Sequence, residues 1–202
     1  LYACNENRLV SLKGFGEKTQ KLIRESIEFR ISNAHNCLFP IAEFVSDEII
    51  TKIKFSSPDI EIFLTGQVRR KCEIITSIEF ISSINESELK LFLSGSELFR
   101  EEIALFKKEV LEGFEIIKAE VLFQKTIPVI FYLCEKNILS NLLFITSGSE
   151  KHMEVLKSNH KFNILEIFDS EASIYKSMDL PYFIPELREG KFEFDLAQKN
   201  GL

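Results

Sequence analysis

Apolar residues spaced three and four apart predict two helices in the first third of the chain. In residues 17–30 the apolar side chains fall on one helical face: Leu22, Ile23 and Ile27. A second helix is predicted across residues 38–55, with Pro40 in its first turn. Its inward-facing side chains are expected to be Ile41, Phe44, Val45, Ile49 and Ile53. The sequence SSPD at residues 56–59 should end this helix.

Beyond this point, strands and helices are expected to alternate. Stretches rich in β-branched and aromatic residues predict strands at residues 60–66, 73–84, 114–124 and 128–133. Helices are predicted at residues 86–93, 96–112, 135–143, 150–159 and 169–178, and a short strand near 162–168. Residues 179–190 look irregular. An all-helical start followed by strands with helices between and after them indicates the α+β fold class.

Composition and charge exclude some classes of protein. The net charge of −6 argues against a whole-surface attraction to nucleic acid, although residues 1–30 are locally basic and residues 86–120 locally acidic. No apolar run is long enough for a membrane helix, and the first residues do not resemble a signal peptide. A cytoplasmic location is therefore expected, with no membrane partner. Because the sequence does not begin with Met, we expect it to be a piece of a longer protein.

Cysteine and histidine spacing gives no sign of a metal centre. The four cysteines lack C-x-x-C spacing, which argues against zinc and disulfides and for a reducing compartment: Cys4, Cys37, Cys72 and Cys134. The three histidines form no metal-binding pattern: His35, His152 and His160. The acidic pair Glu101–Glu102 has no nucleophile or histidine near it in the sequence, so a solvated helix face is the expected role.

The stretch LVSLKGFGEKTQKLI, at residues 9–23, has the helix-hairpin-helix pattern. Gly14 and Gly16 would let the backbone turn tightly and present N–H groups to a phosphate at a helix start. Lys13, Lys18 and Thr19 would add charge and a hydroxyl donor. Such a site binds the DNA backbone rather than the bases. The alternative is a plain glycine turn between two helices.

Four blocks of sequence resemble the family X DNA polymerases, the polymerase-beta-like nucleotidyltransferases. LTGQVRRKCEIITSIEF resembles the palm signature, and the segment around the hairpin resembles the helix-hairpin-helix before the palm of bacterial enzymes. TSGSEKHMEVLK is similar to the family's T-G-S segment, and EASIYKSMDLPYFIPELREG to the end of its thumb. The resemblance implies three parts: a helix-hairpin-helix segment at 1–33, a palm with a mixed sheet at 34–148, and a thumb at 149–202.

The resemblance also locates the positions of the catalytic residues, and most of these positions lack a carboxylate that could bind metal. Nucleotidyl transfer needs two divalent metals held by hard oxygen ligands, normally three aspartates in this family. The corresponding positions hold Ser77, Glu79 and Ile130. One carboxylate is too few for two ions, so we expect no divalent pair and no polymerase activity. The alternative is an active gap-filling polymerase with two Mg²⁺ ions, in which Glu79 acts with another acid: Glu135, Asp59 or Glu61.

The residues that would hold the nucleotide phosphates are partly altered. Gln67 replaces the family's serine, and Thr76 replaces the glycine before the first catalytic position. A residual phosphate site would use the remaining motif residues: Gly66, Arg69, Arg70, Ser147, Gly148 and Ser149. The alternative for the arginine pair is a solvated surface pair or a structural brace to Glu73 or Glu79.

The resemblance implies particular partners. DNA that is gapped, nicked or has a free 3′ end is the expected ligand, bound without sequence preference. A polymerase-and-histidinol-phosphatase (PHP) domain of the same parent chain is the expected protein partner. A K⁺ or Na⁺ ion held by the backbone carbonyls of Val10, Leu12 and Phe15 is the one ion implied, and no other cofactor is expected. A third hypothesis is that the remnant palm docks on the PHP domain and binds no DNA.

Overall fold

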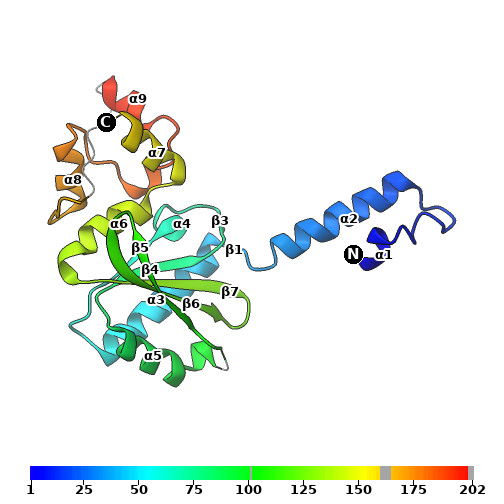
Figure 1. Cartoon of the computed structure of the whole chain (residues 1–202), viewed down its shortest axis with the longest axis horizontal. Helices are drawn as coiled ribbons and strands as arrows, with labels where there is room; N and C mark the ends of the chain where they lie inside the picture. The colour runs from blue at the N-terminus through cyan, green and yellow to red at the C-terminus, as the bar shows by residue number, and fades with distance from the viewer. Residues whose placement is uncertain (101, 160–164, 200–202) are drawn as a thin grey trace. The chain divides into compact units, whose positions relative to one another are not determined.

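The computed structural model describes residues 1–100, 102–159 and 165–199. Its contacts divide the chain into two compact units, Leu1–Asn36 and Cys37–Leu202, which are described separately (Figure 1). We call the first unit the head. It ends close to residue 33, where the sequence places the first boundary. The segment assigned to a thumb, residues 149–202, belongs to the same compact unit as the sheet.

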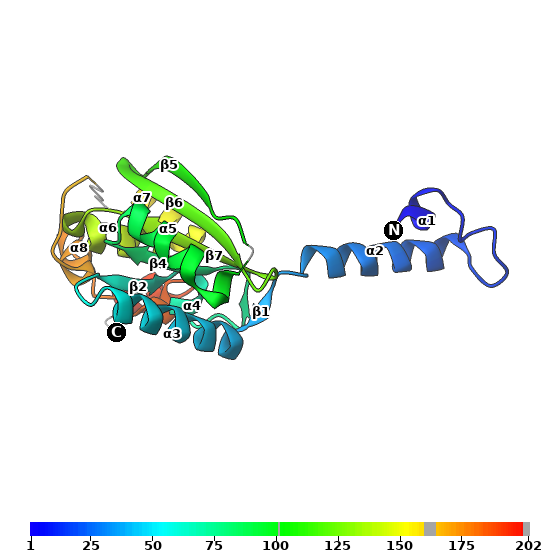
Figure 2. The same ribbon diagram turned by 90° about the horizontal axis from the view of Figure 1, so that it is seen from below.

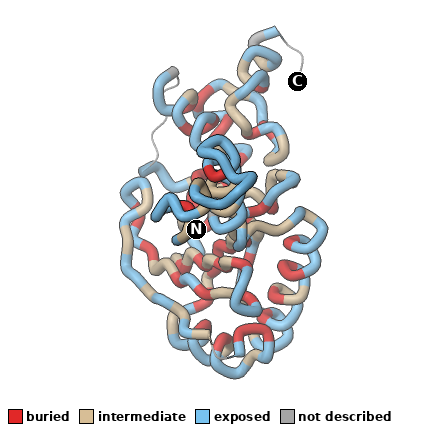
Figure 3. The backbone as a smooth tube through the Cα atoms, turned by 90° about the vertical axis from the view of Figure 1, so that its right-hand side faces the viewer, coloured by how far each residue is buried: buried red, intermediate tan, exposed pale blue. Residues whose placement is uncertain are grey.

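The head consists of a short helix α1 (Tyr2–Asn5), a turn region and the long helix α2 (Glu17–Ser32). Gln20 of α2 is buried and bonds to the turn region: its side chain accepts from the Val10 N–H at 3.2 Å and donates to Asn7 at 2.7 Å. Most other head residues are exposed, which is the pale blue class in Figure 3. Leu22 is among them, whereas Ile23 and Ile27 are half-buried.

The larger unit is built on a five-stranded sheet with the strand order β2-β4-β7-β6-β5. Its strands are β2 (Ile62–Thr65), β4 (Ile78–Ser82), β5 (Leu105–Leu111), β6 (Phe114–Phe123) and β7 (Ile127–Leu133). The central pair β4–β7 is parallel and the other pairs are antiparallel. A separate two-stranded sheet joins β1 (Cys37–Leu38) to β3 (Ile74–Ile75). This mixed sheet with helices confirms the α+β class.

Helices pack on both faces of the sheet (Figure 2). One core includes buried residues of α3 (Phe39–Ser56) and α5 (Glu86–Gly95), and its centre is the stacked pair Phe80–Phe131, with ring centroids 5.2 Å apart. The other core includes residues of α6 (Leu139–Ser147), α7 (Glu150–Asn159) and α8 (Glu171–Ser177). The short elements are α4 (Gly66–Arg69), η1 (Glu97–Phe99), η2 (Lys136–Ile138), η3 (Pro185–Leu187) and α9 (Glu193–Gln198).

The prediction of a helix at residues 96–112 is wrong. Among the described residues of this range, only η1 is helical, and β5 follows and pairs with β6 along its whole length. The turn explains the difference, because Glu112 and Gly113 have φ values of 51° and 93° and allow a tight hairpin. Pairing with a neighbouring strand overrides the local apolar spacing. The expected solvated helix face is therefore absent, and Glu101 lies outside the described residues.

The inward face predicted for α3 is partly wrong. Val45, Ile49 and Ile53 are buried, but Ile41 is 50% exposed and Phe44 is 71% exposed. Successive residues of a helix are rotated by about 100°. The face that packs on the sheet runs through Ala42 and Val45, so the residue before each of them turns toward solvent.

Several other elements form as predicted. The helices at α2, α5, α7 and α8 and the strands at β6 and β7 are confirmed, and α3 ends at Ser56. The strand expected at 73–84 is split into β3 and β4, and the helix expected at 135–143 continues to Ser147. The strand expected near 162–168 lies partly outside the described residues, and residues 165–168 form no strand. Within the described chain, every helix is too short or too polar to span a bilayer.

Candidate functional site

The fold brings together the three positions that the resemblance would make catalytic, Ser77, Glu79 and Ile130. Glu79 on β4 lies in register with Ile130 on the parallel strand β7 and with Thr65 on β2. Gly66 follows β2 directly and has a φ of +60°. A Cβ atom on Gly66 would lie 2.8 Å from the carboxylate carbon of Glu79, so the backbone approaches this carboxylate closely. The structure thus brings an acid, a serine and an isoleucine close together; their match to the three aspartates of the family stays a prediction.

The carboxylate of Glu79 is hydrogen-bonded within the protein. Its Oε1 accepts from the Ser77 hydroxyl at 2.8 Å, and its Oε2 accepts from the Tyr132 hydroxyl at 3.2 Å. Burial, and then the nearby charge of Glu79, raise the pKa of Tyr132, so this hydroxyl stays protonated and remains a donor. Sequence reasoning missed Tyr132. Its place two residues after Ile130, on the same face of β7, was the available signal.

The alternative acids lie at the far ends of the strands. Asp59 and Glu61 precede β2, whose last residue, Thr65, is the one beside Glu79. Glu135 follows β7, two residues after Leu133, which pairs with Ser82. At about 3.3 Å per strand residue, each is roughly 10 Å or more from Glu79 along the sheet.

A further acid, Glu120 on β6, was also missed by sequence reasoning. It pairs with Ile130 and lies two strand spacings from Glu79, roughly 9–10 Å. Its carboxylate is 2.5 Å from the Lys118 ammonium. Within the described ranges, no three residues of the histidine, cysteine, aspartate and glutamate types are grouped as metal ligands would be.

Gln67 and Thr76, the two residues that depart from the family pattern, contact each other. The side-chain oxygen of Gln67 accepts from the Thr76 N–H at 2.7 Å and from the Thr76 hydroxyl at 3.0 Å. In the family pattern these positions are serine and glycine. A glycine has no hydroxyl to offer, so part of this contact depends on both replacements. The side chain of Gln67, at the position expected to face phosphate, is therefore hydrogen-bonded to Thr76 instead.

Both arginines of the pair reach acids in the C-terminal part of the chain. Arg69 donates to both carboxylate oxygens of Glu171, at 2.9 and 2.5 Å, in a bidentate arrangement. Arg70 donates to Glu189 at 2.7 Å and to the carbonyl of Ser147 at 3.2 Å. Neither bond goes to Glu73 or Glu79, the braces considered from the sequence. Glu171 and Glu189 are far away in the chain, which is why the local motif does not reveal them.

Glu171 is shared by a second arginine. The buried Arg188 donates to Glu171 at 2.5 Å and to the carbonyl of Phe183 at 2.9 Å. Its guanidinium also lies over the rings of Tyr175 and Tyr182. Burial alone would raise the pKa of Glu171, but the bonds and charges of the two arginines outweigh it and lower the pKa. Glu171 is thus a buried anion that joins α4 to the C-terminal segment.

The side chains of Ser147 and Ser149 also make hydrogen bonds within the protein. The Ser147 hydroxyl accepts from Arg69 at 2.5 Å and lies 3.1 Å from the hydroxyl of the buried Thr65. The Ser149 hydroxyl accepts from the His152 N–H at the start of α7. Gly148 leaves little room, because a Cβ there would lie 3.1 Å from the side chain of His152.

His152 is buried and has partners on both ring nitrogens. Nδ1 is 2.8 Å from Glu193 and Nε2 is 2.9 Å from the Tyr175 hydroxyl. Burial lowers the pKa of His152, and the neighbouring Glu193 opposes this only in part. A neutral imidazole that donates from Nδ1 and accepts at Nε2 fits both contacts. His35 is exposed, and His160 lies outside the described residues.

A pocket of about 480 Å³ lies where Glu79 faces α7. Its described lining contains four carboxylates and one ammonium group: Glu79, Glu112, Glu150, Glu154 and Lys157. Lys157 is itself paired with Glu112 at 2.5 Å. The electrostatic character of this pocket is therefore acidic, which is unfavourable for a triphosphate.

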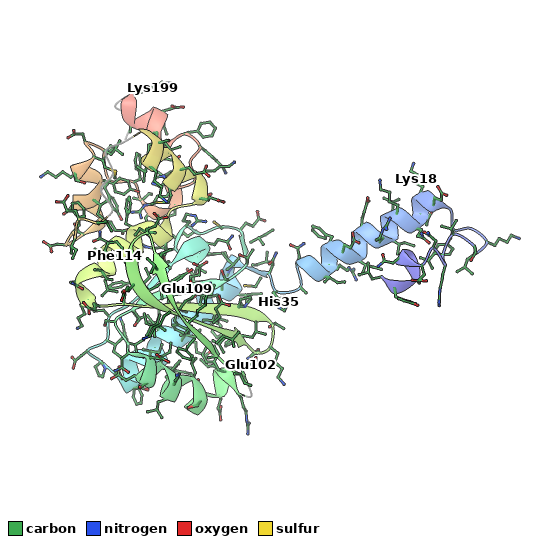
Figure 4. The ribbon with its side chains drawn as sticks, in the orientation of Figure 1. Lys18, His35, Glu102, Glu109, Phe114 and Lys199 are labelled. Carbon is green, nitrogen blue, oxygen red and sulfur yellow. The ribbon has the colours of Figure 1, made fainter. Side chains whose placement is uncertain are left out.

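The hairpin residues of the head lie in an exposed turn. Gly14 has a φ of +91°, and Gly16 is the N-cap residue of α2. Lys13, Lys18 and Thr19 are exposed, and Figure 4 shows Lys18 in the first turn of α2. In the loop implied for a monovalent cation, the Leu12 carbonyl accepts from the Phe15 N–H at 3.0 Å. The cation set of Val10, Leu12 and Phe15 stays a prediction.

No family model matches the chain, and no curated protein matches it. The interpretation of the cleft therefore depends on its own residues and contacts.

Proposed function

We propose that this chain is the DNA-binding region of a repair protein related to the family X DNA polymerases, with a nucleotidyltransferase site that no longer supports polymerisation. The observation that carries the proposal is the state of Glu79. Both of its carboxylate oxygens accept hydrogen bonds from the protein, and the residue beside it on β7 is the apolar Ile130. A metal pair would need further anionic oxygens at this point.

The surrounding contacts support the loss of nucleotide binding. Arg69 and Arg70 are engaged by Glu171 and Glu189, so a triphosphate would have to replace these carboxylates. The adjoining pocket contains more acidic than basic groups. Gln67 is turned to Thr76. The side chains at the positions that would hold phosphate in a polymerase therefore already have partners within the protein, and the pocket beside them is acidic.

The head supports the DNA-binding part of the proposal. Its glycine turn, at the start of a 16-residue helix, carries exposed lysines. Helix N-termini with basic neighbours suit phosphate oxygens. We infer that the ligand is gapped, nicked or 3′-ended DNA, that a PHP domain of the parent chain is the protein partner, and that the protein acts in the cytoplasm. A K⁺ or Na⁺ ion in the hairpin loop belongs to the same proposal.

We expect the chain to bind gapped duplex DNA with an affinity that falls as salt rises. Replacing Lys13 and Lys18 by Ala should weaken binding and should reduce the slope of log K against log salt by about 2, because two phosphate contacts are lost. Fluorescence anisotropy with a labelled gapped duplex between low and physiological salt measures both quantities.

The matched control replaces two exposed lysines outside the head, Lys54 on α3 and Lys176 on α8. This control removes the same net charge, so it should leave the salt slope nearly unchanged. Equal losses in both double variants would show general charge attraction and count against a site in the head. Undetectable binding by the unaltered chain at low salt would favour the third hypothesis, in which the remnant palm only docks on another domain.

A further inference from the structure

Strand β5 forms one edge of the five-stranded sheet. It pairs with β6 on one side, and no described strand pairs with its other side (Figure 2). It is seven residues long and has no proline or bulge that would block further pairing. Leu105 is 67% exposed and Val110 is 69% exposed. An edge of this kind has backbone donors and acceptors available for another strand.

The sequence of β5, LFKKEVL, is complementary to itself when it is reversed about Lys108. In an antiparallel pair of two copies centred there, Lys107 of one copy faces Glu109 of the other, twice. Phe106 faces Val110, and Leu105 faces Leu111. Opposite charges, an aromatic with a β-branched residue, and two leucines are all favourable cross-strand pairs.

Directly opposed residues of antiparallel strands have their side chains on the same face of the sheet. In each copy, Lys107 already lies 2.9 Å from Glu109, and the exposed fractions of their side chains are 76% and 31%. Figure 4 shows Glu109 within the hairpin. A second copy would give Lys107 and Glu109 each a further oppositely charged partner, and the ion pair within each copy would remain.

The two Lys108 residues, one from each copy, face each other at the centre. They form the single like-charged pair in this arrangement. The pocket beside Lys108 is also lined by Glu86 and Glu115, which offset the charge locally. The long lysine side chain can reach away from the two-fold axis while its stem covers apolar surface.

We propose that β5 is a dimerisation edge: two copies of this chain pair antiparallel about Lys108 and join their sheets into one. We take the partner strand to be a second copy of β5, because its charges are complementary. A partner strand must offer Glu opposite Lys107 and Lys opposite Glu109, and a reversed copy of β5 offers both. Such an interface is isologous and closes on itself as a two-fold dimer. This inference is independent of DNA binding, and its test contains no DNA.

Sedimentation velocity between about 1 µM and about 1 mM protein should show a monomer–dimer equilibrium. The substitution Lys107→Glu places a second carboxylate opposite Glu109 of the other copy, and should weaken association at least about tenfold. The double charge exchange Lys107→Glu with Glu109→Lys should restore association to within about threefold of the original. Circular dichroism melting verifies that each variant is folded.

A cysteine pair tests the register. Lys108→Cys should form a disulfide-linked dimer in oxidised glutathione, because directly opposite residues have Cα atoms within disulfide range. Leu105→Cys is the matched control on the same strand. In the proposed dimer, the two introduced cysteines would be six residues apart along the strands, roughly 20 Å. The Leu105→Cys variant should therefore form no disulfide-linked dimer under the same conditions. Both variants keep the four native cysteines, so any disulfide formed through a native cysteine would appear equally in both.

Either of two results would overturn the proposal. A monomer at every concentration excludes the dimer. A dimer that survives Lys107→Glu, or that links as readily through Leu105→Cys as through Lys108→Cys, uses a different surface.

Discussion

Replacing Glu171 by Ala should lower the free energy of unfolding by about 3–5 kcal/mol. This carboxylate bonds to Arg69 and Arg188, and Arg188 is completely buried. Its removal would leave a guanidinium in the interior without its anion, and desolvated unpaired charges are among the costliest defects in a folded protein. Because domain stabilities are typically about 5–15 kcal/mol, the change would be a large fraction of the total. Urea unfolding followed by circular dichroism measures it.

The control for this experiment is Glu186→Ala. Glu186 also pairs with a basic residue, Lys71, at 2.8 Å, but the exposed fractions of the two side chains are 33% and 62%. Surface ion pairs of this kind contribute about 0–1 kcal/mol. Similar losses in the two variants would mean that Glu171 is not a buried link between α4 and the C-terminal segment.

Replacing Gly190 by Ala should cost about 2–4 kcal/mol of unfolding free energy. Gly190 has a φ of +66°, a region that residues with a side chain rarely adopt. An added Cβ would also lie 2.6 Å from the Cβ of Lys151 and 2.7 Å from the backbone nitrogen of His152. Backbone atoms cannot rotate away as a side chain can, so the segment or α7 would have to move.

Gly95→Ala is the matched control for the same type of substitution. Gly95 is the last residue of α5, and an added Cβ there would meet no atom within 4 Å. Because Ala favours a helix over Gly by up to about 1 kcal/mol, this variant should be neutral or slightly stabilised. Thermal and urea unfolding of the pair measures the difference, and equal effects would contradict the close packing at Gly190.

The elements that were predicted correctly are those with strong local signals. The SSPD sequence ends α3, and continuous runs of β-branched and aromatic residues form β6 and β7. Residues 96–112 were misassigned because their apolar residues fit a helical spacing, while pairing with β6 and the turn at Glu112–Gly113 decide the fold. Such pairing is a non-local effect that a single sequence pattern does not contain.

The candidate site was located by its motif, but the partners of the motif were not. Glu79 and Ile130 are paired on adjacent strands, and Ser77, just before β4, donates to Glu79. The bonds of Arg69 and Arg70 to Glu171 and Glu189 depend on how the C-terminal segment packs against α4. Nothing near the arginines in the sequence specifies those acids, so bracing and phosphate binding could not be separated before the contacts were known.

The most direct measurement is primer extension on a one-nucleotide-gapped duplex, with Mg²⁺ or Mn²⁺ and all four deoxynucleotides, beside a binding assay on the same DNA. We expect the DNA to be bound and the primer to stay at its original length, because Glu79 alone offers a carboxylate at the three positions that the proposed relationship would make catalytic. Growth of the primer by this chain, abolished in the Glu79→Gln variant, would contradict the proposal that the cleft has lost its chemistry.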